Sequence, residues 1–179
     1  MPQIRRYGKV GDIIIGMAGA GGLKRIHPQL IYWMRVNEAI GFDEYWADPR
    51  FEAKRPDMKG PKLRKVGDRT YRRDLISGEW RFEQSMHFLP SAKQKNGGHV
   101  ARDTKVDRLL LSHEFTYWGA RGPALPGHLM GLFPNPRGHK CPKDGPLLEE
   151  LHNLINVHNP CGVVGDPADW SNRRYFASG

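Results

Sequence analysis

The chain has 179 residues, with 28 Lys or Arg against 19 Asp or Glu, a formal charge of +9 and two cysteines. No apolar run approaches the roughly 18 residues that a membrane span needs. At this length 39% hydrophobic residues can form a core without disulfides, so disulfide scaffolds, collagen-like chains and wholly disordered chains are excluded.

The organisation expected from composition is one domain over residues 1–179. Its core runs from about 9 to 141, a C-terminal helix over 146–157 packs on it, and a tail, 171–179, need not be ordered. The opening residues lack the apolar stretch of a secretory signal, and two thiols suit a reducing compartment. We therefore expect a cytoplasmic protein without a membrane partner.

The first third of the chain predicts two strands joined by a glycine-rich loop. KVGDIIIGM, over 9–17, is a Gly-Asp turn followed by a continuous Ile-rich run, which is typical of a buried strand. The loop AGAGGLKRIHPQ follows, and LIYWMRVN, over 30–37, predicts the second strand.

The middle of the chain predicts a short helix and a hairpin. Asp43 is expected to cap a helix that Pro49 ends. Prolines and glycine make 55–67 a loop, and GDRTYRRD and SGEWRFEQSM form a hairpin with a turn near Ser77-Gly78.

The last part predicts a loop over 89–103, a strand in VDRLLLSHEFTYWG bent near Ser112, an irregular Gly/Pro-rich run, and a helix from Pro146. The helix presents one apolar face, made of Leu147, Leu148, Leu151, Leu154 and Ile155. These elements predict a small α+β fold with a mostly antiparallel, barrel-like sheet and a few helices.

Basic charge is concentrated between Arg50 and Arg81, where eleven Lys or Arg face five Asp or Glu, a net +6. With interleaved aromatic residues, such a segment can lie along a phosphate backbone; a solvated, mobile loop is the alternative. By contrast, 142–170 carries Lys143 alone against five acidic residues. The candidate phosphate contacts of the basic segment are Lys54, Arg55, Lys62, Arg64, Lys65, Arg72 and Arg73.

A second candidate for phosphate is the loop GMAGAGG, Gly16 to Gly22, with Lys24 and Arg25 after it. Glycines allow backbone N–H groups to approach a phosphate. No Gly-Lys-Ser/Thr follows, which excludes a Walker loop, and Pro28 argues against the helix of a dinucleotide-binding turn. A plain flexible connection remains the alternative.

Aromatic residues cluster at Tyr32-Trp33, at Phe42/Tyr45/Trp46 and at Phe115/Tyr117/Trp118. They are either core or the walls of a cleft that stacks on a base. Strand alternation sends Phe115 and Tyr117 to one face and Trp118 to the other, so one site cannot use all three. The candidate base contacts are Tyr32, Trp33, Arg35, Tyr71, Tyr117 and Trp118.

Two further sets of residues have weaker spacing. Zinc ligands are available in His139, Cys141, His158 and Cys161, but a helix separates the pairs and His-x-Cys is uncommon, so structural thiols and surface histidines are the alternative. The candidate acid/base groups are His87, His113, Glu114 and Asp103. Neighbours on a strand point to opposite faces, so Ser112-His113-Glu114 is not a triad. No cofactor is expected.

Several phrases in order resemble the second of the nucleotide-modification-associated domain families. They run from about Lys9 to Cys141: KVGDIIIG, LIYWMRVNEAIGFDEYWADPRFEAKRP, GDRTYRRD, DTKVDRLLLSHEFTYWGARGPALP and RGHKC. The resemblance implies a small phage or bacterial protein associated with modified bases. The opening strand and YWMRVNEAIGFDEYW are also similar to PUA-like barrels, including ASCH and EVE domains, in which a cleft beside a curved sheet accepts a base or nucleotide.

These observations favour a binding module for a nucleotide, or for a modified base within nucleic acid, in a modified-nucleotide or phage–host context. One alternative is an enzyme of modified-nucleotide metabolism that uses the same cleft. Another is a phage protein that sequesters a nucleotide signal or binds a host factor. DNA, RNA and free nucleotide are not distinguished by the sequence.

Overall fold

The computed structural model describes residues 2–18, 28–85, 98, 100–134 and 138–167. The chain forms two compact units. Unit 1 comprises Met1–Gly8 and Glu38–Leu111, and unit 2 comprises Lys9–Asn37 and Ser112–Gly179. Each unit is therefore assembled from segments that are distant in the sequence.

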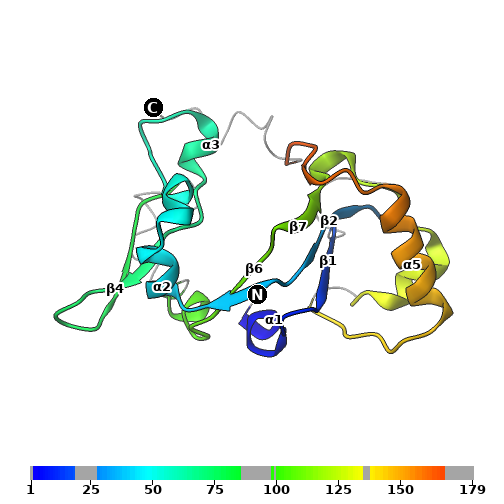
Figure 1. The fold of residues 1–179 in the computed structure, drawn as a ribbon, viewed down its shortest axis with the longest axis horizontal. Coiled ribbons are helices and arrows are strands. Elements are labelled where there is room, and N and C mark those ends of the chain that lie inside the picture. The colour runs from blue at the N-terminus through cyan, green and yellow to red at the C-terminus, as the bar shows by residue number, and fades with distance from the viewer. Residues whose placement is uncertain (1, 19–27, 86–97, 99, 135–137, 168–179) are drawn as a thin grey trace. The chain divides into compact units, whose positions relative to one another are not determined.

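Unit 1 contains short helices and two small antiparallel sheets (Figure 1). Residues 98 and 100–103 are also helical. Its remaining elements are α1 (Pro2–Tyr7), β3 (Glu38–Ile40), α2 (Phe42–Ala47), η1 (Pro49–Lys54), α3 (Lys62–Lys65), β4 (Tyr71–Arg73), β5 (Trp80–Phe82) and β6 (Leu109–Leu111). Strand β3 pairs with β6, and β4 pairs with β5. Phe42 and Tyr71 form its small core together with Trp80, Val100 and Leu109.

Unit 2 contains a four-stranded sheet in the order β1-β2-β7-β8. Its elements are β1 (Ile13–Met17), β2 (Leu30–Arg35), β7 (Glu114–Tyr117), η3 (Gly119–Arg121), η4 (Gly127–Leu132), α5 (Pro146–Val157) and β8 (Gly162–Val163). The first three strands pair antiparallel, and β8 joins β7 in parallel.

The two faces of this sheet have different side chains. One face carries Ile15, Trp33 and Thr116, which are aligned across three strands. Both Ile15 and Trp33 belong to the core that includes Leu151 and Ile155 of α5. The opposite face carries Tyr32 and its direct partner Tyr117, because successive side chains on a strand point to opposite sides.

The structure confirms an α+β fold with mostly antiparallel pairing. The hairpin of β4 and β5, the break between β6 and β7 at Ser112-His113, and the helix from Pro146 all occur as predicted. The strands within the described ranges form separate small sheets and do not close into a barrel.

Several local predictions were wrong. The predicted loop 55–67 contains the one-turn helix α3, and helix replaces loop at the described residues 98 and 100–103. The irregular run after β7 contains η3 and η4. The short strands β3 and β8 were not predicted, since two or three residues give no detectable alternation.

The N-terminus of α2 is capped differently from the prediction. Gly41 is the N-cap residue, and Asp43 lies in the first turn. The N–H of Phe42 donates instead to Oδ1 of Asp107, at 2.9 Å. A carboxylate 65 residues away therefore satisfies the helix end, and local sequence gave no signal of it.

No helix among the residues that the structure describes is long and apolar enough to cross a membrane.

Candidate functional site

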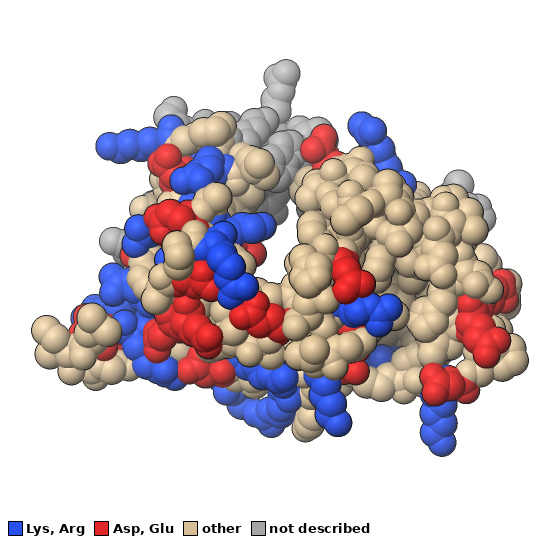
Figure 2. Space-filling model, viewed as in Figure 1, with Lys and Arg blue, Asp and Glu red and all other residues tan. Residues whose placement is uncertain are grey.

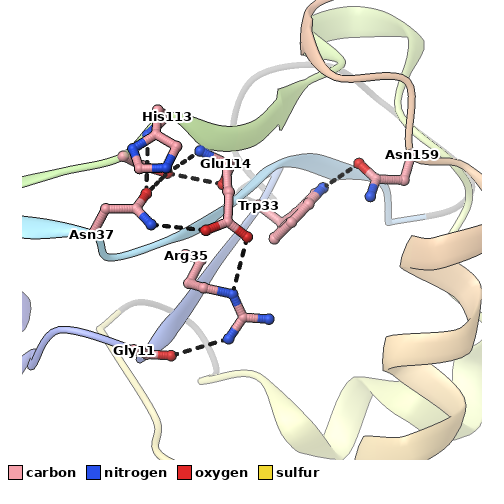
Figure 3. Close-up of polar contacts among 8 residues, drawn as sticks. Gly11, Trp33, Arg35, Asn37, His113, Glu114 and Asn159 are labelled. Carbon is pink, nitrogen blue, oxygen red and sulfur yellow. Dashed lines mark hydrogen bonds and ion pairs between the residues drawn. The ribbon is translucent and has the colours of Figure 1, made fainter.

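Both tryptophans predicted to contact a base lie in the core of unit 2. Trp33 is 8% exposed and Trp118 is 4% exposed. The Trp33 indole N–H donates to Oδ1 of Asn159 at 3.1 Å (Figure 3), and that of Trp118 donates to the carbonyl of His158 at 2.8 Å. Each indole thus donates to the segment after α5. A buried tryptophan N–H usually has such a hydrogen-bond acceptor.

Tyr32 and Tyr117 lie on the opposite sheet face and are both half-buried. The Tyr32 ring lies against Gly16 so closely that a Cβ there would overlap the ring. Burial raises the pKa of both phenols, so both are neutral hydrogen-bonding groups near neutral pH. The two rings are neighbouring aromatic surfaces on one sheet face.

A polar cluster fixes the end of the β2–β7 pair (Figure 3). The Nε of Arg35 lies 3.3 Å from Oε2 of Glu114, and Nδ2 of Asn37 donates to Oε1 of Glu114 at 2.8 Å. Oδ1 of Asn37 accepts the N–H of His113 at 3.0 Å. The bond from Asn37, aided by Arg35, lowers the pKa of Glu114. Glu114 is therefore an ionised acceptor that pins the strand register.

In unit 1, Tyr71 and Arg73 are engaged by protein groups. Tyr71 is 8% exposed, packs edge-on against Phe42 and donates to Oδ2 of Asp103 at 3.1 Å. Arg73 donates to Oδ2 of Asp43 at 2.9 Å and also pairs with Asp107. These two predicted contacts thus hold unit 1 together.

Asp103, a candidate acid/base group, accepts hydrogen bonds from Tyr71 and Arg102. Burial raises the pKa of Asp103, but these hydrogen bonds and nearby cations outweigh it, and the net shift is downward. Asp103 is thus an ionised structural acceptor.

Three arginines gather around the ring of Trp46 in unit 1. Their guanidinium carbons lie 4.5 Å (Arg55), 5.1 Å (Arg72) and 5.3 Å (Arg69) from the ring centroid. These are cation–π distances. We call Trp46, Arg55, Arg69 and Arg72 the Trp46 cluster.

Two carboxylates oppose these three arginines. Glu52 pairs with both Arg69 and Arg55, and Glu83 lies 3.7 Å from Arg72. Arg69 is only 4% exposed. The Nε atoms of Arg69 and Arg72 are buried and have no hydrogen-bond partner among the described residues. The cluster is thus incompletely satisfied by the part of the chain that the structure describes.

The cluster belongs to a strongly basic stretch of unit 1. Lys54–Arg72 carries eight Lys or Arg against two Asp, a net +6. Arg64 donates to the carbonyl of Ala53, and Lys54 and Lys65 have no ion pair with any described carboxylate. In Figure 2 basic and acidic side chains are interspersed over unit 1, whereas charged side chains over α5 are mainly acidic.

Sequence reasoning did not assign Trp46 or Arg69 to a site. Trp46 belongs to one of three aromatic clusters that the sequence left open as core or cleft wall, and Arg69 is one arginine among many. The available signal was spacing: Trp46 follows Tyr45 on a short helix, so one ring can be buried while the next stays at the surface.

The other candidates are dispersed or lie outside the described residues. Lys24, Arg25 and His87 fall in undescribed segments, as does the side chain of Lys62. His113 is exposed. Over the ranges described, no three His, Cys, Asp or Glu side chains group as a metal site would require. The four predicted zinc ligands are all exposed: His139, Cys141, His158 and Cys161.

A family model described as nucleotide modification associated domain 2 matches residues 1–174. The chain belongs to this family. No curated protein and no solved structure matches the chain. The family's name indicates an association with nucleotide modification.

Two sequence phrases that resemble nucleotide modification associated domain 2 lie in contact in unit 1: GDRTYRRD and AKRP. A Cβ at Gly67 would overlap the backbone of Lys54 and Pro56. Oδ1 of Asp68 accepts the Tyr45 hydroxyl at 2.7 Å, and the N–H of Arg69 donates to the carbonyl of Lys54 at 3.2 Å. These phrases therefore have a structural meaning: they bring Arg55, Arg69 and Arg72 to Trp46.

Proposed function

We propose that the chain binds a nucleotide or nucleic acid, and that unit 1 holds phosphate with the two partly exposed arginines of the Trp46 cluster, Arg55 and Arg72, together with Lys54 and Lys65. The observation that carries the proposal is the gathering of three guanidinium groups around one indole ring. Membership of a family associated with nucleotide modification supports the ligand class.

Phosphate suits this surface because arginine presents planar donors that match phosphate oxygens, while lysine adds a mobile charge. The indole ring restricts the arginines before a ligand arrives, so less side-chain entropy is lost on binding. Release of counterions from the nucleic acid then favours association at low salt.

Within unit 2, Tyr32 and Tyr117 are the two of the six predicted base contacts that we propose for stacking on a base. Both rings are half-buried and lie on the sheet face opposite α5. Stacking on an aromatic ring contributes about 1–3 kcal/mol per base. The neutral phenols add hydrogen-bonding groups that can distinguish one modified base from another.

The test is a charge-reversed pair, Lys54→Glu with Lys65→Glu, measured by fluorescence anisotropy against labelled single- and double-stranded DNA and RNA at several salt concentrations. We expect weaker binding. For a duplex, the negative slope of log affinity against log salt should become shallower by about 2. Lysines were chosen because Arg73 and Arg69 hold the fold through ion pairs.

The matched control is Lys105→Glu with Lys143→Glu, which changes net charge by the same amount at two exposed lysines outside the Trp46 region. It should retain most of the affinity. Equal losses in the two double variants would show that only net charge matters and would remove the Trp46 region from the proposal.

A further inference from the structure

The turn between β4 and β5 exposes two adjacent aliphatic side chains. Leu75 is 100% exposed and Ile76 is 99% exposed. Figure 1 shows this turn reaching out beyond the paired strands. Single exposed aliphatic residues are common on proteins. Here two adjacent aliphatic residues lie at the end of a projecting hairpin, which places their apolar surface where a partner can contact it.

Hydrogen bonds hold the turn in a defined shape. Oδ1 of Asp74 accepts the N–H of Ile76 at 3.0 Å and that of Ser77 at 2.9 Å. The Asp74 N–H donates to the carbonyl of Glu79 at 2.8 Å, and Gly78 adopts φ 69°, a left-handed conformation that glycine tolerates. The tip is therefore held in shape while its two aliphatic side chains have no support from the hairpin.

Each of the two strands that carry this turn also carries an arginine, and Arg72 and Arg81 are direct cross-strand partners. Arg81 on β5 is paired with Asp74 at 3.4 Å yet half its side chain is exposed. Arg72 on β4 belongs to the Trp46 cluster. Leu75 follows Arg72 by three residues, and β4 ends at Arg73, so at most about 10 Å of chain separates the two positions. Because a DNA minor groove is about 7.5 Å deep, a tip within that reach of a phosphate-bound arginine can contact the base stack.

We infer that Leu75 and Ile76 form an apolar wedge that enters a base step of double-stranded DNA. The inference rests on the proposed function and names its substrate class. Proteins that insert aliphatic side chains between base pairs combine this tip with cationic groups on the flanking phosphates. A protein that recognises a base inside a duplex must first unstack that base, and an inserted wedge lowers the free-energy cost of unstacking.

The experiment uses the full chain and a DNA duplex that carries 2-aminopurine, whose fluorescence rises when it is unstacked. The wild type should raise the fluorescence on binding. Leu75→Ser with Ile76→Ser should abolish the rise and weaken duplex binding by about fivefold or more, with little change in affinity for single strands. Because both residues are fully exposed, its thermal unfolding should match the wild type.

The control variant, Val157→Ser with Val163→Ser, removes two other exposed aliphatic side chains and should behave as the wild type. Duplex binding without a rise in fluorescence, or a rise that persists in the Leu75/Ile76 variant, would overturn the wedge and leave the phosphate proposal standing. Binding of the tip to anionic vesicles or double-stranded RNA in preference to duplex DNA would also overturn it. Absence of binding to both oligonucleotides and free nucleotides at low salt would instead defeat the proposed function.

Discussion

At the scale of single residues, neighbours in the sequence have opposite roles. Trp33 belongs to the core beneath α5, while Tyr32 lies on the other sheet face against Gly16. Strand alternation predicts that they separate, but it does not say which face α5 covers. That choice determines which aromatic ring is accessible to a ligand.

Gly16→Ala tests the position of the Tyr32 ring. The new methyl group would overlap the ring, so we expect a loss of about 1–3 kcal/mol in the free energy of unfolding, measured with urea. In a Tyr32→Ala background most of this loss should disappear. Gly127→Ala is the control, because a Cβ there has open space around it. An equal loss in both backgrounds would show that the ring does not set the cost.

At the scale of elements, α5 shows how far periodicity extends. Leu151 and Ile155 are buried, and Leu148 and Leu154 pack beside them as the helical spacing indicates. Leu147, expected on the same face, is 44% exposed and lies outside the core cluster. Periodicity gives the direction of the apolar stripe, whereas the neighbouring elements decide where along the helix it is covered.

Two leucine substitutions in α5 separate these cases. Leu151→Ala should lower the free energy of unfolding by about 2–5 kcal/mol, because it leaves a cavity at a residue that is 2% exposed. Leu147→Ala should change it by no more than about 0.5 kcal/mol. Urea unfolding of both variants makes the comparison, and similar losses would contradict the packing described here.

At the scale of the whole molecule, acid should destabilise the chain. Hydrogen bonds from arginine side chains lower the pKa of Glu38 and Asp48, and the turn N–H groups of Ser77 and Ile76 lower that of Asp74 to about 2. The pKa values of Asp103 and Glu114 are lowered as well. A carboxyl with a lower pKa in the folded state adds stability above its unfolded pKa and loses it as pH falls.

We therefore expect the urea midpoint to stay nearly constant from pH 7 to about pH 5 and then to fall steadily towards pH 2. Asp74→Asn should be less stable than the wild type at pH 7 and should lose less of its stability below pH 4. A wild-type midpoint that is the same at pH 2.5 and pH 7 would contradict these assignments.

What the sequence determined by itself is what depends on neighbours along the chain. The turn after β4, the helix from Pro146, the bend at Ser112 and the basic charge of Lys54–Arg72 follow from local spacing and composition. Each phrase that resembles the family is also one continuous stretch of the sequence.

Tertiary structure decided which of these residues remain available to a ligand. Arg73 forms ion pairs with Asp43 and Asp107, and the Trp33 indole donates a hydrogen bond to Asn159, 126 residues away. Arg69 meets Trp46 because Gly67 lets two segments touch. Contacts between segments far apart in the chain leave no periodic trace in the sequence, since burial and ion pairing depend on which segments meet in space.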